Sequence, residues 1–211
     1  MAKLTIAIPK GRLEHDTLEL FSAAGLRLNE PAGSRRLACD DELGRTRFLF
    51  VKPADVPVYV EHGIADCGVV GRDVLLESEA DLLQPLSLDF GSCQIALAAP
   101  ADMTKNGHTM LRVATKYPHI AARYFGERGQ PVEIIKLSGS VELASALGLA
   151  DCIVDLVETG RTLRENGLMI VEVIAQSAAH LVVNRASYQL KAQVIAKLIS
   201  SLKGALLSVN T

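Results

Sequence analysis

The feature that most constrains the fold is an internal repeat. The string GIADC occupies residues 63–67, and GLADC occupies residues 148–152. The first is preceded by FLFVK and followed by GVVGRDVL, whereas the second is preceded by VEIIKL and followed by IVDLVETGRTL. Each copy predicts a strand, a turn, an amphipathic helix, a second strand, a polar turn and a second helix. The chain therefore contains two similar α/β halves.

The predicted strands are mostly continuous Val, Ile and Leu runs between helices, a pattern typical of parallel strands buried on both faces. We expect strands at 4–8, 47–51, 66–70, 94–98, 111–114, 132–136, 152–157, 169–174 and 180–184. We expect helices at 13–24, 56–62, 118–126, 140–147 and 159–166, and a long one from Ser187. This pattern predicts two α/β lobes with mostly parallel sheets and a central cleft. Lobe I spans residues 1–90, to which 177–211 returns, and lobe II spans 91–176.

Composition excludes several classes of protein. The 211 residues carry a net charge of −2, so no global basic field attracts nucleic acid or an anionic membrane. The five histidines and four scattered cysteines show no zinc-ligand spacing, so we expect no direct His/Cys metal site. The N-terminal apolar run is broken by Pro9 and Lys10, and no window approaches a membrane span. We expect a cytoplasmic protein.

The segment that follows the predicted strand 152–157 is the strongest candidate for a ligand site. Thr159, Gly160, Arg161 and Thr162 form a turn that opens a helix. Backbone N–H groups at a helix N-terminus bind anions, and a glycine lets a ligand approach the backbone closely. Capping of the helix by the Thr159 side chain is the alternative interpretation.

Three carboxylates surround this turn. Asp151 and Asp155 bracket the strand, and Glu158 begins the loop. An acidic side chain near the carboxyl end of a buried strand needs a partner, and the hydroxyl groups of a sugar are one such partner. The segment therefore predicts a site for a ribose 5-phosphate.

Candidate cations lie in the first half of the chain. Lys10 and Arg12 follow the first strand, where ligands of α/β sheets collect, so we expect them to contact phosphate groups. The other candidates are Arg35, Arg36, Lys52 and Arg72, for which solvated surface charge is the alternative.

Four strings carry a resemblance to a known family. IAIPKGRL, VYVEHGIADCGVVGRDVL, VATKYPHIAARYF and GLADCIVDLVETGRTLRENGL are similar to ATP phosphoribosyltransferase, the first enzyme of histidine biosynthesis. The resemblance runs over nearly the whole chain in order. It implies a type II periplasmic-binding-protein-like fold and condensation of ATP with 5-phosphoribosyl 1-pyrophosphate, with Mg²⁺ carried on the substrate phosphates.

The resemblance also assigns roles to residues. The groups facing pyrophosphate, which we place in the catalytic set, are Lys10, Arg12 and Lys52. The groups implied for phosphoribosyl pyrophosphate are Asp151, Asp155, Glu158, Thr159, Gly160, Arg161 and Thr162. Those implied for ATP are Arg35, Arg36, Asp66, Gly68, Gly71 and Asp73.

Two other functions compete with this one. A solute-binding protein has the same two-lobe plan but performs no reaction, and the absence of a signal peptide disfavours it. A phosphoribosyltransferase of the common kind has two adjacent acids before its phosphate loop, whereas this chain has Asp155-Leu156-Val157-Glu158.

The resemblance finally implies partners. The length matches the short form of the family, without a C-terminal regulatory domain, so we expect a regulatory subunit resembling histidyl-tRNA synthetase and a homodimer of this chain. The predicted C-terminal helix carries Ile195, Ile199 and Leu207 beside its main apolar stripe. This extra width predicts either a partner surface or deeper packing in lobe I.

Overall fold

The computed structural model describes residues 3–29, 37–101 and 110–209. The chain forms two compact units: a first unit of Met1–Gly91 with Ala178–Thr211, and a second unit of Ser92–Ser177. The chain thus passes between the units twice, after Gly91 and after Ser177. Within the described ranges, no helix is long and apolar enough to cross a membrane.

The first unit is built on a six-stranded sheet with the order β2-β3-β1-β4-β11-β5. The three strands β3, β1 and β4 are parallel, while β2, β11 and β5 are each antiparallel to their neighbours. Their bounds are β1 Leu4–Pro9, β2 Ala38–Asp40, β3 Thr46–Val51, β4 Cys67–Gly71, β5 Leu83–Ser87 and β11 Ala179–Val183.

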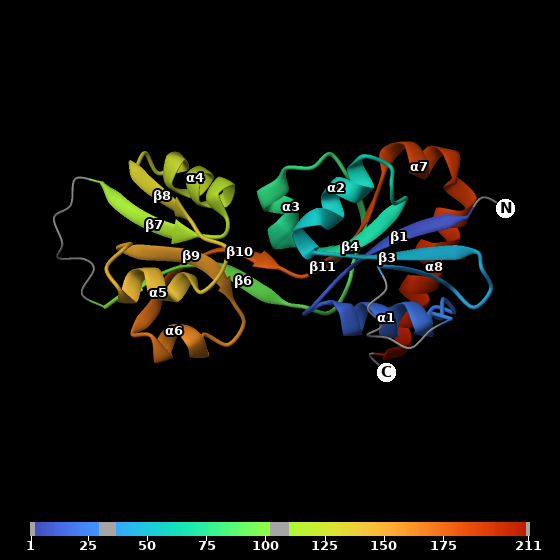
Figure 1. The fold of residues 1–211 in the computed structure, drawn as a ribbon, viewed down its shortest axis with the longest axis horizontal. Helices are drawn as coiled ribbons and strands as arrows, with labels where there is room; N and C mark the ends of the chain where they lie inside the picture. The colour runs from blue at the N-terminus through green and yellow to red at the C-terminus, as the bar shows by residue number, and fades with distance from the viewer. Residues whose placement is uncertain (1–2, 30–36, 102–109, 210–211) are drawn as a thin grey trace. The chain divides into compact units, whose positions relative to one another are not determined.

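Helices cover both faces of this sheet (Figure 1). One face packs against α1 (Glu14–Ala23) and α8 (Ala192–Val209) through a core that includes Phe21, Phe48 and Leu202. The other face packs against α2 (Val56–Glu61) and α3 (Arg72–Ser78) through a core that includes Val56, Val60 and Leu75. The short elements η1 (Pro53–Asp55) and α7 (Arg185–Leu190) complete the unit.

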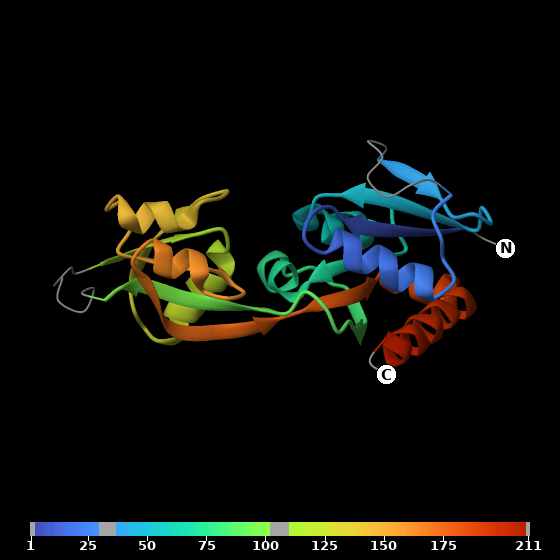
Figure 2. The same cartoon turned by 90° about the horizontal axis from the view of Figure 1, so that it is seen from below.

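The second unit is built on a five-stranded sheet with the order β10-β6-β9-β7-β8. Strands β9, β7 and β8 are parallel, and β6 and β10 are antiparallel additions. Helix α4 lies on one side, and α5 and α6 lie on the other (Figures 1 and 2). The bounds are β6 Cys93–Pro100, β7 Leu111–Thr115, β8 Val132–Lys136, β9 Cys152–Val157, β10 Leu168–Ser177, α4 Pro118–Glu127, α5 Val141–Ala146 and α6 Arg161–Glu165.

The two sheets confirm the repeat. The order β3-β1-β4-β11-β5 in the first unit matches β8-β7-β9-β6-β10 in the second, with the same strand directions. Helices α2 and α5 precede β4 and β9, and helices α3 and α6 follow them. The predicted α/β class is confirmed, and the parallel arrangement holds for the central strands of each sheet.

The C-terminal segment differs from the prediction. Instead of one helix from Ser187, α7 and α8 are separated at Lys191. Ile195 is fully buried and Ile199 packs against the same core, so deeper packing in the first unit is the correct alternative for these two residues. Leu207, on the same helix, is 75% exposed.

Candidate active site

The aspartate of the first GIADC copy joins four segments of the first unit. The Asp66 carboxylate accepts hydrogen bonds from the Thr5 backbone N–H at 2.8 Å, the Ser187 hydroxyl at 2.7 Å and the Lys191 ammonium at 2.7 Å. In return, the Asp66 N–H donates to the Thr5 carbonyl at 2.8 Å. Asp66 therefore holds β1 beside β4 and attaches the start of α8 to both.

Asp151 has the equivalent position in the second unit. Its carboxylate accepts from the Arg112 N–H at 2.9 Å and from the Arg112 guanidinium at 2.9 Å, and its own N–H donates to the Arg112 carbonyl at 2.9 Å. The pKa of Arg112 is raised, first by this hydrogen bond and second by the attraction between the charges. In both halves of the chain, the aspartate of the string shared by the two copies therefore joins its own strand to the neighbouring parallel strand.

These contacts correct two sequence predictions. Asp66 and Asp151 lie at the amino ends of β4 and β9, whereas the predicted phosphate turn follows the carboxyl end of β9. A six-residue strand separates Asp151 from that turn, which corresponds to about 20 Å at about 3.3 Å per residue. We therefore remove Asp151 from the phosphoribosyl set and Asp66 from the ATP set.

The turn after β9 has a glycine in the left-handed region at the start of a helix. Gly160 has φ 69° and ψ 11° and is the N-cap residue of α6. The Thr159 hydroxyl accepts a long hydrogen bond of 3.4 Å from the Arg161 N–H, which is the kind of contact that the capping alternative predicts. The exposed Thr162 hydroxyl has no hydrogen-bond partner among the residues that the structure describes. The turn thus presents a hydroxyl and the first N–H groups of a helix to solvent.

The acidic groups beside this turn are Asp155 and Glu158. Asp155 lies within β9 opposite Ala96 of β6, and it is 8% exposed. One of its carboxylate oxygens accepts from the Leu156 N–H at 2.9 Å. Glu158 follows the end of the strand and is exposed. Of the three predicted carboxylates, these two are near the turn.

Three of the predicted cations, Lys10, Arg12 and Lys52, follow strands at the carboxyl edge of the first sheet. Strands β1 and β3 are parallel and end in register at Pro9 and Val51, so Lys10 and Lys52 follow neighbouring strand ends. The Lys10 N–H donates to the Val51 carbonyl at 2.8 Å, which extends the pairing by one residue. The side chains of Lys52 and Arg12 are exposed. Arg35 and Arg36 lie outside the described residues.

The remaining residues of the predicted ATP set are packed inside the first unit. A Cβ on Gly68 would lie 2.9 Å from the Val56 side chain and 3.0 Å from the Ala7 carbonyl, so this glycine allows a helix to approach the sheet. The Asp73 carboxylate lies directly against Gly71, and Asp73 is 4% exposed. Packing accounts for Gly68 and Gly71 without a ligand.

Sequence reasoning left two exposed cations out of the site sets. Arg72 begins α3 after the carboxyl end of β4, and Lys116 follows the carboxyl end of β7. The signal was available, because both residues directly follow an apolar strand, as Lys10 does.

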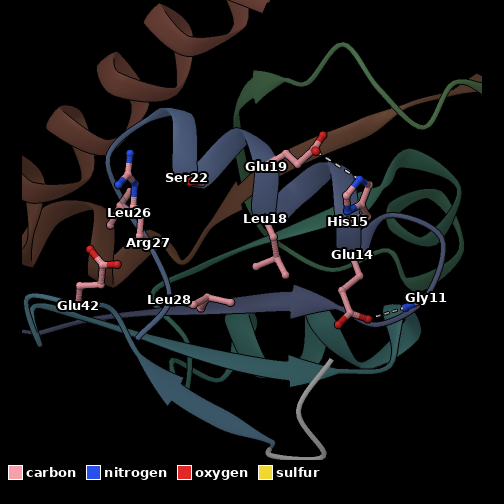
Figure 3. A pocket seen from close by; sticks show the side chains of 10 residues that line it. All are labelled: Gly11, Glu14, His15, Leu18, Glu19, Ser22, Leu26, Arg27, Leu28 and Glu42. Carbon is pink, nitrogen blue, oxygen red and sulfur yellow. Dashed lines mark hydrogen bonds and ion pairs between the residues drawn. The ribbon is translucent and has the colours of Figure 1, made fainter. Parts of the chain in front are cut away.

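A groove of about 660 Å³ runs along α1 beside this edge (Figure 3). It begins at Gly11, whose N–H donates to the Glu14 carboxylate at 3.1 Å. His15, Asp16 and Glu19 place possible ligand atoms within 4.8 Å of one another, and within the described segments they are the one cluster of three or more His, Cys, Asp or Glu side chains with this spacing. His15 and Glu19 are exposed, and the His15 Nε2 lies 3.3 Å from the Glu19 carboxylate along the helix, so a surface side-chain contact explains the group.

Taken together, the fold and the loops define a class of protein. It is a two-unit α/β protein whose second unit carries a phosphate-type turn at a strand's carboxyl end. In its first unit, lysine and arginine side chains follow the carboxyl ends of parallel strands. Such an arrangement is typical of α/β proteins that bind phosphorylated small molecules.

Comparison with known proteins gives the particular family. Residues 52–204 match the family model described as ATP phosphoribosyltransferase. ATP phosphoribosyltransferase from Thermoanaerobacter sp. (strain X514) is 48% identical over 204 residues, which cover 96% of each chain. The enzyme of that name from Geobacter metallireducens is 46% identical over 205 residues, covering 95% of this chain and 97% of the relative. The chain belongs to the ATP phosphoribosyltransferase family, which carries out the first step of histidine biosynthesis.

A solved structure supports the same conclusion. The ATP phosphoribosyl transferase (HisG:HisZ) complex from Thermotoga maritima contains a chain that is 37% identical, with a TM-score of 0.87. The match covers 97% of this chain and 99% of that one. The fold is therefore of the type II periplasmic-binding-protein-like kind, as the sequence predicted. Enzymes of this family generally use a metal ion with their phosphate substrates.

Proposed function

We propose that the chain transfers the 5-phosphoribosyl group of phosphoribosyl pyrophosphate to N1 of the adenine of ATP, with release of pyrophosphate. Membership of the family supports the reaction. The observation that carries the placement of the substrate is the turn after β9, in which Gly160 adopts φ 69° at the N-terminus of α6.

The turn is the proposed site of the ribose 5-phosphate. A phosphate there accepts hydrogen bonds from the N–H groups of the first helical turn and from the hydroxyls of Thr159 and Thr162. The Arg161 side chain is paired with the Glu165 carboxylate at 2.7 Å, so we assign no charge contribution to it. Asp155 and Glu158 are the carboxylates that we assign to the sugar hydroxyls.

The edge formed by Lys10, Arg12 and Lys52 is the proposed site of the pyrophosphate and of the ATP phosphates. Positive charges there stabilise the negative charge that develops on the departing pyrophosphate. Arg12 offers a planar fork of N–H donors, whereas the two lysines act as point charges. Arg35 and Arg36 remain predictions for the same role.

Mg²⁺ is the metal ion that we assign to the substrate phosphates. It prefers oxygen ligands and is commonly held by one or two carboxylates together with phosphate oxygens. Asp155 and Glu158 supply carboxylates of this kind beside the turn, so the residues present fit the ion. When bound, the ion neutralises charge on the phosphates.

The chemistry needs no nucleophile from the protein. The adenine N1 forms a bond to C1 of the ribose while the bond from C1 to the pyrophosphate oxygen breaks, and pyrophosphate leaves with the electron pair. Catalysis then consists of holding the two substrates in line and stabilising the leaving group. We assign no general base.

An ultraviolet assay tests the reaction. ATP, phosphoribosyl pyrophosphate and Mg²⁺ are mixed with the chain, and the absorbance of the N1-modified adenine is followed. We expect product only when both substrates are present, and a large loss of kcat in Lys10→Ala. The matched control is Lys197→Ala, which removes an exposed lysine from α8. A folded wild-type chain that binds both substrates without forming product would refute the proposal.

We also propose that the chain is the catalytic subunit of a hetero-oligomer and forms a homodimer alone. The supporting observation is that the Thermotoga maritima relative was solved as a HisG:HisZ complex. A regulatory chain resembling histidyl-tRNA synthetase is then the expected source of histidine sensing. We expect the isolated chain to be insensitive to histidine at a concentration that inhibits the reconstituted complex. Strong non-competitive inhibition of the isolated chain would contradict this.

A cytoplasmic location completes the proposal, because ATP and phosphoribosyl pyrophosphate are cytoplasmic metabolites. Cell fractionation with detection of the chain tests it, and recovery in the periplasmic fraction would contradict it.

A further inference from the structure

Arg164 is a third exposed cation outside the predicted site sets, and its side chain lies against the turn of residues 159–162. A Cβ on Gly160 would lie 3.2 Å from Arg164 Nη1. Because a carbon–carbon bond is about 1.5 Å long, Nη1 is within about 4.7 Å of the Gly160 Cα. The Arg164 N–H donates to the Gly160 carbonyl at 3.2 Å, and helical side chains lean towards the N-terminus of their helix. The guanidinium therefore reaches back to the glycine of the turn.

The contacts of this guanidinium differ from those of three other arginines in the second unit. Arg112, Arg128 and Arg161 each donate to a carboxylate, at 2.9, 2.6 and 2.7 Å respectively. No hydrogen bond or ion pair joins the Arg164 side chain to any residue that the structure describes. The N–H donors of Arg164 are therefore available to a ligand at the turn.

The charges around the turn show why a ligand there needs this arginine. A phosphate monoester carries about 1.5–2 negative charges at pH 7, and the carboxylates Asp155 and Glu158 lie beside the turn. The charge of Arg161 is balanced by Glu165. Positive charge near the N-terminus of a helix is unfavourable, so α6 gains no stability from a guanidinium beside its N-cap. A phosphate, by contrast, is attracted both by the guanidinium and by the N–H groups of the turn.

We propose that Arg164 binds the 5-phosphate of phosphoribosyl pyrophosphate and supplies the positive charge of the turn. A guanidinium can donate to two phosphate oxygens through adjacent N–H groups. The 5-phosphate forms and breaks no bond in the transfer, so this contact is the same in the ground state and in the transition state. It should therefore determine KM for phosphoribosyl pyrophosphate rather than kcat. The inference rests on the proposed function, which places this phosphate at the turn.

The first test is Arg164→Gln, which removes the charge and keeps a polar side chain. We expect KM for phosphoribosyl pyrophosphate to rise roughly tenfold, the lower end for a hydrogen bond to a charged group, because solvent screens an exposed side chain. The kcat and the KM for ATP should stay within about twofold of wild type. The Tm should stay within about 2 °C, because the residue is exposed. An unchanged KM for phosphoribosyl pyrophosphate would overturn the proposal, as would a lowered kcat accompanied by a lowered Tm.

Three other variants separate the contact from the charge of the region. Arg123→Gln removes an exposed arginine from α4, on the other side of the sheet from α6, and should leave both constants within about twofold of wild type (Figure 1). Arg161→Gln should raise KM less than Arg164→Gln does, because the Arg161 charge is already paired. Equal rises in these two variants would show that the total charge of α6 is responsible, and the proposal would fail. Arg164→Lys should restore part of the lost affinity, and a lysine variant no better than glutamine would overturn the assigned charge.

Inhibition by the two halves of the substrate locates the contact. Ribose 5-phosphate and inorganic pyrophosphate are each used as inhibitors of the wild-type chain and of Arg164→Gln. The substitution should raise the inhibition constant of ribose 5-phosphate by roughly tenfold and leave that of pyrophosphate within about twofold. The reverse pattern would place Arg164 at the leaving group and overturn the proposal. A wild-type chain that forms no product refutes the proposed function, whereas an active chain whose Arg164→Gln variant keeps the wild-type KM refutes this inference alone.

Discussion

Replacing Asp66 by alanine should destabilise the protein without weakening ATP binding. The side chain of Asp66 is 7% exposed and that of Lys191 is 25% exposed, so their ion pair is largely shielded from water. The substitution leaves the Lys191 ammonium and the Thr5 N–H without their carboxylate acceptor. Breaking a buried pair from one side costs about 3–5 kcal/mol. Because Lys191 keeps a second acceptor, the Lys3 carbonyl at 3.0 Å, we take the lower end, about 3 kcal/mol.

For a chain of this size, 1 kcal/mol shifts Tm by about 2–4 °C, so Tm should fall by about 6–12 °C. Calorimetry gives the Tm, and titration with ATP gives the Kd at a temperature where both proteins are folded. Asp55→Ala is the control, since it removes an exposed carboxylate that makes no cap hydrogen bond. An Asp66→Ala protein with an unchanged Tm and a weakened ATP affinity would refute the structural role and restore Asp66 to the nucleotide site.

Three further outcomes follow from the structure. Thr162→Ala should weaken the binding of phosphoribosyl pyrophosphate, raising its Kd about 10- to 150-fold, because a hydrogen bond to a charged group contributes about 1.5–3 kcal/mol. An unchanged Kd in calorimetric titration would contradict the assignment of this turn to the phosphate. Burial raises the pKa of the Cys152 thiol to about 12. At pH 8 a colorimetric disulfide reagent should therefore modify the half-buried Cys39 and reach Cys152 only after unfolding. Early modification of Cys152 would contradict its burial. Burial, and secondarily the hydrogen bond to Glu172, raises the pKa of Tyr124 to about 12, so its contribution to stability is present below about pH 10 and is lost as pH rises towards 12. Tyr124→Phe should therefore flatten the decline of Tm over that range, and an unaltered decline would show that other groups cause it.

The central strands were predictable because their signal is local. The runs at 4–8 and 152–157 are apolar along their whole length, and they form β1 and β9 in the middle of the two sheets. Strand β5, by contrast, contains Pro85 and mixed polarity, and it is an edge strand that depends on β11 for its pairing. Long-range pairing decides such a strand, and apolar content does not reveal it.

Amino-acid composition likewise does not reveal whether a strand pairs parallel or antiparallel to its neighbour. β6 and β11 are as apolar as β1, yet both run antiparallel to their parallel neighbours. The placement of Asp66 was a different kind of error, because the sequence contained the information. The aspartate precedes its strand, and a residue that precedes a strand lies at the amino end, away from the loops that bind ligands in α/β sheets.

The residues of the candidate site also divide into those that the local sequence reveals and those that depend on contacts distant in the sequence. A motif of adjacent residues, Thr159–Thr162, could be found from the sequence because the turn is made by neighbours in the chain. The hydrogen bond from the Arg12 guanidinium to the Gly91 carbonyl could not, because it joins two loops through a backbone carbonyl that any residue possesses.

The position of β11 within its sheet has a consequence for synthesis on the ribosome. β11 lies between β4 and β5, and α8 covers the face that α1 shares, yet both belong to the last segment of the first unit to be made. At about 5–20 residues per second, this segment follows the end of β5 by several seconds or more. During that interval β4 and β5 have no strand between them, and the strands of the second unit, β6 to β10, are synthesised before β11. The unit that begins first is therefore completed last, and its exposed β4 edge is the part of the nascent chain most in need of protection from aggregation.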